Sequence, residues 1–163
     1  MNLNRFLVFA GKVTLAHVVT YLASGTIAYP LLTREFYMGP NPIFATFMRT
    51  EAEPALWSHV MTWFIPAQLL RGLLISAALY PFCDILATWS FVKRCLSIAG
   101  LYIVLGFWAA AVAAPGTIEG WVYLRPEITG YAHFKVQPEI ILQGFALAAW
   151  VAGWMVQEPG KPA

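Results

Sequence analysis

Residues 64–82 read FIPAQLLRGLLISAALYPF, an apolar stretch that carries one full positive charge, Arg71, near its middle. The stretch belongs to a longer apolar run over about residues 57–80, and similar runs cover about residues 6–30, 95–114 and 138–156. A helix needs about 20 apolar residues to cross the ~30 Å hydrocarbon core of a bilayer. The four runs therefore predict four transmembrane helices.

The composition points to the same environment. Hydrophobic residues make up 60% of the chain and charged residues 11%, whereas about a quarter of the residues of soluble domains are charged. We therefore predict an all-α, polytopic integral membrane protein with a single transmembrane domain over residues 1–163. The formal net charge of +2, with lysines and arginines scattered along the chain, argues against nucleic-acid binding.

Four crossings place both chain termini on one side of the membrane. The two longer connections, about residues 31–56 and 115–137, then lie on the other side and are expected to form a small extramembrane cap over the four-helix bundle. Runs rich in aromatic and β-branched residues in the second connection are compatible with a small hairpin. The short loop with Lys93 and Arg94 favours cytoplasmic termini under the positive-inside rule.

Small residues recur at every fourth position of the third and fourth runs, which predicts close packing of those helices. They are Gly106, Ala110 and Ala114 in the third run and Gly144, Ala148 and Ala152 in the fourth. Gly72 and Ser76 form a shorter stripe in the second run. These stripes predict a compact bundle, and the alternative is that one of them mediates dimerisation.

Arg71 is the residue that most needs an explanation. At 1.5 Å per residue it lies about 14 Å from the end of its helix, near the bilayer centre, where an arginine costs about 2.5–3.5 kcal/mol. It should therefore face the bundle interior, with Gln68 on the same face of the helix. One interpretation is a structural tie to backbone carbonyls, Gln68 and Gln143. Another is a site for an anionic ligand or lipid headgroup, and a third is snorkelling to the cytoplasmic surface.

A second polar feature lies in the first run, where Thr14, His17, Tyr21 and Ser24 share one helix face. This stripe is expected to point inward. A histidine there is either a neutral, hydrogen-bonded core residue or a group that relays protons.

Metal and cofactor chemistry is poorly supported. The outer face gathers His59, His133, Glu119 and Glu139, whose side chains can ligate transition metals, but no metal-ligand spacing accompanies them. We therefore predict no metal site, and no motif indicates a cofactor.

The function predicted from these features is binding. We expect a non-catalytic membrane protein, alone or as a subunit of a larger assembly, whose polar site around Arg71 binds an anionic group or lipid. Its expected partners are membrane lipids and either a second copy or other membrane subunits. The alternative is a small oligomeric transporter or channel. A metal-dependent membrane enzyme with its site at the outer face ranks third, since no catalytic motif is present.

Overall fold

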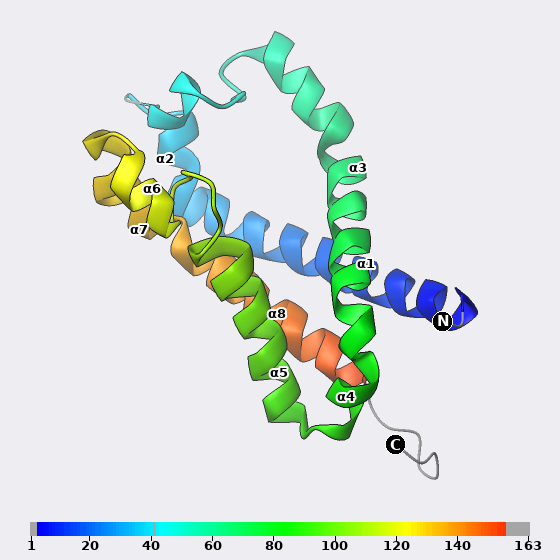
Figure 1. Ribbon diagram of the computed structural model, residues 1–163. Helices are drawn as coiled ribbons and strands as arrows, with labels where there is room; N and C mark the ends of the chain where they lie inside the picture. The colour runs from blue at the N-terminus through cyan, green and yellow to red at the C-terminus, as the bar shows by residue number, and fades with distance from the viewer. Residues whose placement is uncertain (1–2, 41, 156–163) are drawn as a thin grey trace.

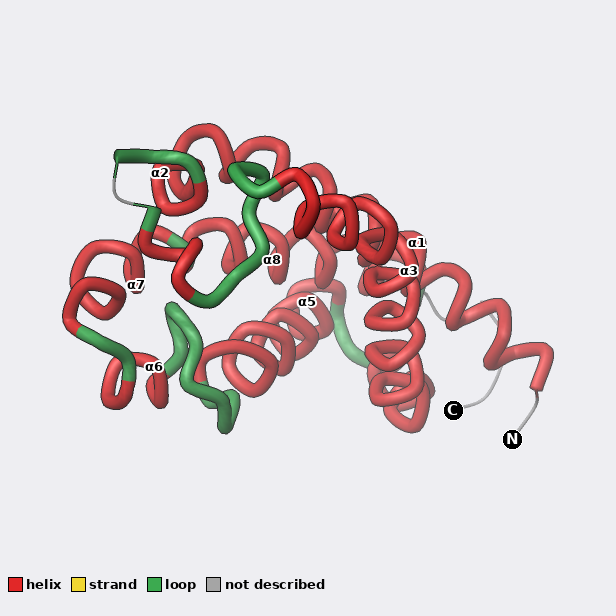
Figure 2. Tube along the Cα trace, turned by 90° about the horizontal axis from the view of Figure 1, so that it is seen from above, coloured by secondary structure: helices red, strands yellow, loops and turns green. Residues whose placement is uncertain are grey.

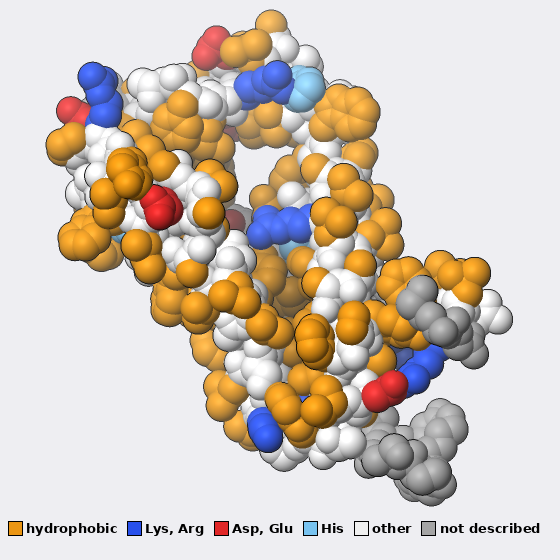
Figure 3. Space-filling model, in the orientation of Figure 1, with side chains coloured by type: hydrophobic (Ala, Val, Ile, Leu, Met, Phe, Trp, Pro, Cys, Tyr) orange, Lys and Arg blue, Asp and Glu red, His pale blue; other side chains and the backbone are white. Residues whose placement is uncertain are grey.

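The computed structural model describes residues 3–40 and 42–155, and all regular elements there are helices. Three segments are long and apolar enough to cross a membrane, namely Leu3–Tyr37, Pro54–Thr88 and Phe91–Trp108. Only 28–33% of the residues in the most apolar window of each segment are buried inside the protein. Helices that expose apolar side chains on most of their surface are typical of membrane spans, and orange side chains cover much of the surface in Figure 3.

The three segments are built from eight elements. The first joins α1 (Leu3–Ala28), the π-type turns of η1 (Tyr29–Thr33) and α2 (Arg34–Tyr37). The second joins α3 (Pro54–Leu79), η3 (Tyr80–Phe82) and α4 (Cys83–Thr88). The third joins α5 (Phe91–Gly100) and η4 (Leu101–Trp108), which also has π-type turns.

The third helix differs from its predicted range of 95–114 at both ends. It begins earlier because the Ser90 side chain caps α5, accepting a hydrogen bond from the Lys93 backbone N–H at 3.4 Å. It ends at Trp108, before an alanine-rich stretch that leads into Pro115 and Gly116. Proline disfavours helical geometry at the residue before it, so the helix does not continue to Ala114.

The remaining elements form the cap and a further long helix. They are η2 (Ile43–Thr46), α6 (Ile118–Tyr123), η5 (Ile128–Ala132), α7 (His133–Lys135) and α8 (Gln137–Trp154). The hairpin expected within residues 115–137 does not form, since this region is helical. Thr117 starts α6 by accepting a hydrogen bond from the Gly120 N–H at 2.8 Å. Phe36, Phe44 and Ala132 form the small apolar core of the cap.

The long helices lie in an open arrangement. α1 packs against α3 and α8, and α5 packs against α8. In Figure 1 the start of α1 and the end of α8 lie on the same side as α4, whereas α2, α6 and α7 gather at the other end. Figure 2 shows the same helices from above, with α5 and α3 separated. The two ends of the structure are therefore different in character, with a cap at one end only.

An apolar core fills the half of the structure nearest the chain ends. The buried members of this core cluster are Val13, Ala16, Leu79, Cys83, Leu86, Ile98, Ala99, Ile103, Leu147, Ala148, Val151, Ala152 and Met155. Buried polar side chains of α1, α3 and α8 lie just beyond it, towards the cap. The interior therefore changes from apolar to polar about midway along the helices.

Small residues let neighbouring helices approach closely at two points. A Cβ added to Gly72 of α3 would lie 2.8 Å from the Cα atom of Thr14 in α1, and one added to Gly144 of α8 would lie 2.6 Å from Cγ1 of Ile103 in η4. Gly106, in contrast, is exposed. The close contact between the third and fourth predicted helices is therefore made by Gly144 and not by Gly106.

Replacing Gly72 with Ala is expected to lower the free energy of unfolding by about 1–3 kcal/mol, because the methyl group meets backbone that cannot rotate away. Gly153→Ala is the matched control, since nothing lies within 4 Å of a Cβ at that position. Unfolding of both purified variants in mixed detergent micelles measures the difference. Equal stability of the two variants would contradict the close approach of α1 and α3.

Candidate functional site

A fully buried histidine joins three helices in the polar part of the interior. His17 of α1 is 0% exposed. Its Nε2 lies 3.1 Å from Oε1 of Gln68 in α3, and its Nδ1 lies 3.5 Å from Nε2 of Gln143 in α8. A carbonyl oxygen only accepts and an amide N–H only donates. His17 is therefore the neutral tautomer with its proton on Nε2, in a directed chain from Gln143 through His17 to Gln68.

These hydrogen bonds join residues that the sequence analysis assigned to two separate polar sites. Gln68 and Gln143 were expected beside Arg71, but their hydrogen-bond partner is His17. Tyr21, also from the polar stripe of α1, is half-buried, with its ring centroid 6.0 Å from that of His17.

The other two stripe residues lie on the buried side of α1 as well. Thr14 is 8% exposed, and its hydroxyl has no hydrogen-bond partner among the described residues. Ser24, nearer the cap, is 3% exposed. Neither side chain contributes to the chain of hydrogen bonds through His17.

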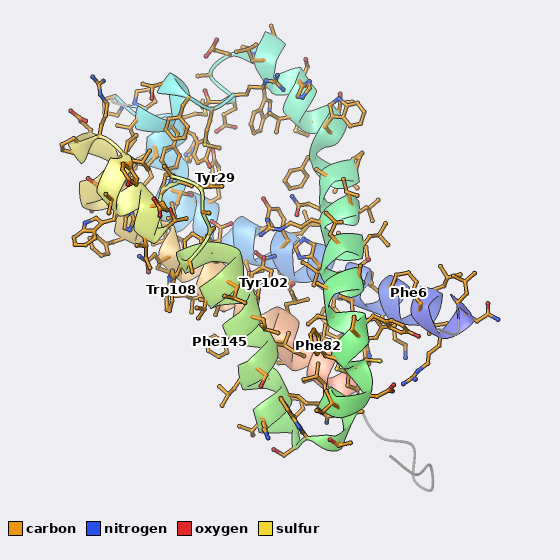
Figure 4. The ribbon with its side chains drawn as sticks, viewed as in Figure 1. Phe6, Tyr29, Phe82, Tyr102, Trp108 and Phe145 are labelled. Carbon is orange, nitrogen blue, oxygen red and sulfur yellow. The ribbon has the colours of Figure 1, made fainter. Side chains whose placement is uncertain are left out.

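Arg71 lies at the edge of this polar interior. Its Nη2 donates a hydrogen bond to the Tyr102 hydroxyl at 3.4 Å, and the guanidinium carbon lies 5.8 Å from the centroid of the Tyr102 ring. Tyr102 projects from the side of η4 that faces α3, opposite Trp108 (Figure 4). Figure 3 shows an opening between α3 and the cap with a basic side chain at its lower edge. Arg71 is exposed and reaches from α3 towards η4.

A carboxylate lies on the cap side of the same interior. Glu139, in the first turn of α8, is partly buried, and a Cβ added to Gly25 of α1 would lie 3.6 Å from its Oε1. The charges of both Glu139 and Arg71 act on the phenols of Tyr21 and Tyr102. The sequence placed Glu139 at the outer helix end only. In the structure its carboxyl group lies next to the polar interior, one turn of α8 from Gln143.

The four weak metal candidates do not come together. In the part of the chain that the structure describes, no group of three or more His, Cys, Asp or Glu side chains could hold a metal ion. His133, in α7, accepts a hydrogen bond at Nδ1 from the Gly116 N–H at 3.1 Å. His59, in α3, lies with its ring centroid 6.4 Å from that of Trp63.

Burial lowers the pKa of His133 below its ordinary value of about 6.5. The unfolded chain therefore binds a proton at His133 more readily than the folded chain does. Above about pH 6.5 this difference does not reduce the stability of the fold, and as the pH falls further the proton uptake favours unfolding. We expect the melting temperature of the wild type to fall between pH 7.5 and pH 5.5. His133→Gln should reduce this fall and His59→Gln should not. A fall of the same size in both variants would exclude His133 as its cause.

The polar interior offers an excess of hydrogen-bond donors near Arg71. Oε1 of Gln68 already accepts a hydrogen bond from His17, which leaves the Gln68 amide N–H groups free to donate. The Tyr102 oxygen accepts from Arg71 and keeps its own O–H to donate. Arg71 has five N–H donors and one hydrogen-bond acceptor, Tyr102. Such a set matches a ligand rich in acceptors, above all a carboxylate or a phosphate.

Comparison with known proteins identifies no relative. The chain matches no protein-family model, no curated protein and no solved structure.

Proposed function

We propose that the chain is a four-helix transmembrane protein that binds an anionic amphiphile at Arg71, with no catalytic role. The observation that carries this proposal is the environment of Arg71. It is an exposed cation on a helix proposed to span the membrane, and its one hydrogen-bond partner among the described residues is the uncharged Tyr102. An arginine near the bilayer centre costs about 2.5–3.5 kcal/mol when it is not compensated. An anionic head next to Tyr102 and Gln68 would supply the compensation.

The fourth crossing in this proposal is α8. Its 18 residues extend about 27 Å at 1.5 Å per residue, close to the thickness of the hydrocarbon core. Two of its polar residues, Glu139 and Gln143, lie close to α1, next to Gly25 and His17 respectively. At its far end the Lys12 Nζ lies 6.0 Å from the Trp154 ring centroid, a pairing typical of the membrane interface.

The shape of the site supports an amphiphile more than a small soluble anion. α3 packs mainly on α1, and η4 packs on α8 and α5, so α3 and η4 are not closely packed and leave an opening between them that Arg71 bridges. An acyl chain can lie in such an opening while its head reaches Arg71 from the side. Leu70, Leu73 and Leu74 of α3 are exposed and would contact the lipid around it.

The alternatives have weaker support. A transporter needs a polar path to both faces, whereas the apolar core cluster fills the half of the bundle nearest the chain ends. A metal-dependent enzyme needs a ligand cluster at the outer face, and His59 and His133 make separate contacts there. A second copy or another membrane subunit remains part of the proposal, because the exposed face of α3 is a surface on which a helix could pack.

Thermal unfolding of the purified, delipidated protein in maltoside micelles tests the binding function. Oleate should raise the melting temperature, because a ligand that binds only the folded state stabilises it. Methyl oleate has the same chain without the charge and should leave the melting temperature unchanged. Acetate at matched ionic strength provides a carboxylate without the chain, and its effect should be smaller than that of oleate. Equal effects of oleate and methyl oleate would contradict an anion site.

Cysteine labelling tests the topology. Met48→Cys and Gly130→Cys, each in a background without Cys83 and Cys95, should react with a membrane-impermeant maleimide in intact cells. Leu3→Cys should react only after permeabilisation, because the N-terminus is expected in the cytoplasm. Labelling of all three sites in intact cells would put Leu3 on the same side as both loops, which would contradict the proposed crossing of α1, and the reverse pattern would invert the orientation.

A further inference from the structure

A second arginine is buried without a partner at the end of the bundle that carries the chain ends. Arg94 of α5 is 6% exposed, and its Nε and Nη1 atoms have no hydrogen-bond partner. A buried guanidinium that lacks both a counter-charge and hydrogen bonds destabilises a fold unless something outside the described chain compensates it. Arg94 therefore needs an anion that the described residues, 3–40 and 42–155, do not provide.

The described carboxylates do not supply this anion. Asp84, in α4, is the one carboxylate at this end within residues 3–40 and 42–155, and it forms an ion pair with Arg5. The other described carboxylates lie in the cap or in the helix turns next to it, at the opposite end: Glu35, Glu51, Glu53, Glu119, Glu127 and Glu139.

The surroundings of Arg94 are positive. It lies in the second turn of α5, and side chains on a helix lean back towards its N-terminus, so the guanidinium reaches towards the positive end of the helix dipole. Ser90 caps that end. Lys93, the preceding residue, is an exposed cation on the same turn of α5, with Nζ 4.1 Å from the centroid of the Trp89 ring.

Aromatic residues place this end at the level of the lipid headgroups. Trp89 lies under Lys93, and Trp154 lies 6.0 Å from the Lys12 ammonium. Tryptophans paired with cations are typical anchors at the membrane interface. The anions at that level of a bilayer are the phosphates of its lipids, and the planar fork of arginine suits a phosphate.

We infer that Arg94, Lys93 and the first turn of α5 form a phosphate-binding site at the membrane face that carries the chain ends. Its ligand is either the phosphate of an anionic phospholipid or free inorganic phosphate. The site is distinct from Arg71 and does not depend on the function proposed for Arg71.

Melting of the delipidated wild type in maltoside micelles tests this inference with two phosphate sources. Dioleoylphosphatidylglycerol should raise the melting temperature by several degrees, and dioleoylglycerol, which has the same acyl chains without the phosphate, should not. The melting temperature in inorganic phosphate, compared with that in chloride at equal ionic strength, tests whether the free anion binds. A shift with the lipid alone assigns the site to a headgroup, and an equal shift with inorganic phosphate assigns it to the soluble anion. No shift with either would overturn the inference without any variant.

Substitutions then locate the site. Arg94→Met should abolish the shift, and Lys93→Gln should reduce it. Lys12→Gln is the matched control, because it removes a cation from the same end but outside the site, and it should leave the shift intact. Without ligand, Arg94→Met should melt at or above the wild-type temperature, since it removes an uncompensated buried charge. A full shift in Arg94→Met, or a clear loss of its ligand-free stability, would contradict the proposed site.

Discussion

Replacing Arg71 with Met is expected to weaken oleate binding about 30-fold or more. Removing one partner of a desolvated, hydrogen-bonded charge pair costs about 2–5 kcal/mol, which corresponds to this loss or a greater one. Methionine keeps much of the length of the side chain, so the opening between α3 and η4 should keep its shape. Titration of the delipidated protein with oleate, followed by intrinsic tryptophan fluorescence, measures the dissociation constant.

Arg71→Lys separates charge from geometry. Lysine keeps the positive charge but loses the planar fork that contacts a carboxylate through two parallel N–H groups. Its affinity for oleate should lie between those of the wild type and Arg71→Met. Leu70→Met is the matched control, because it changes a neighbouring, exposed side chain of α3 to the same residue. It should bind oleate like the wild type.

The stability of Arg71→Met distinguishes the ligand site from a structural tie. Arg71 is exposed and makes one hydrogen bond of 3.4 Å to the described residues, so removing it from the ligand-free protein should not lower the free energy of unfolding by more than about 0.5 kcal/mol. A loss of several kcal/mol with unchanged oleate affinity would mean that Arg71 holds helices together and that the amphiphile binds elsewhere.

The helical spans were predictable from the sequence because the length of an apolar run is set by bilayer thickness. Helix ends were less predictable because they depend on local capping. Ser90 caps α5, which begins at Phe91, four residues before the predicted start at residue 95, and this places Arg94 inside the helix. The sequence had assigned Arg94, together with Lys93, to a loop. Nothing in the sequence therefore indicated that Arg94 is buried with no hydrogen-bond partner for its Nε and Nη1 among the described residues.

The candidate site was predictable within each helix but not between helices. Helical spacing placed His17 with Tyr21 on one face of α1, and Gln68 with Arg71 on one face of α3. Contacts between the faces depend on the rotation and crossing of the helices, which spacing within one helix does not encode. The hydrogen bond from His17 to Gln68 was therefore missed. Tyr102 was missed as well, because the π-type turns of η4 alter the face on which its side chain lies.

The chain of hydrogen bonds through His17 predicts a large loss of stability in His17→Leu. Leucine removes both the donor to Gln68 and the acceptor for Gln143, whose side chains are 9% and 3% exposed. An unsatisfied buried polar group costs about 1–3 kcal/mol, so two of them should lower the free energy of unfolding by about 3 kcal/mol. Unfolding in mixed micelles of maltoside and dodecyl sulfate measures this change.

Two further variants test whether the loss comes from the unsatisfied amides. His17→Gln keeps one donor and one acceptor and should lose less stability than His17→Leu. A triple variant with leucine at His17, Gln68 and Gln143 leaves no buried amide without a partner, so it should be more stable than His17→Leu alone. If the three leucine substitutions instead destabilise the protein additively, each side chain contributes through its own packing. The directed chain from Gln143 to Gln68 would then not be what holds α1, α3 and α8 together.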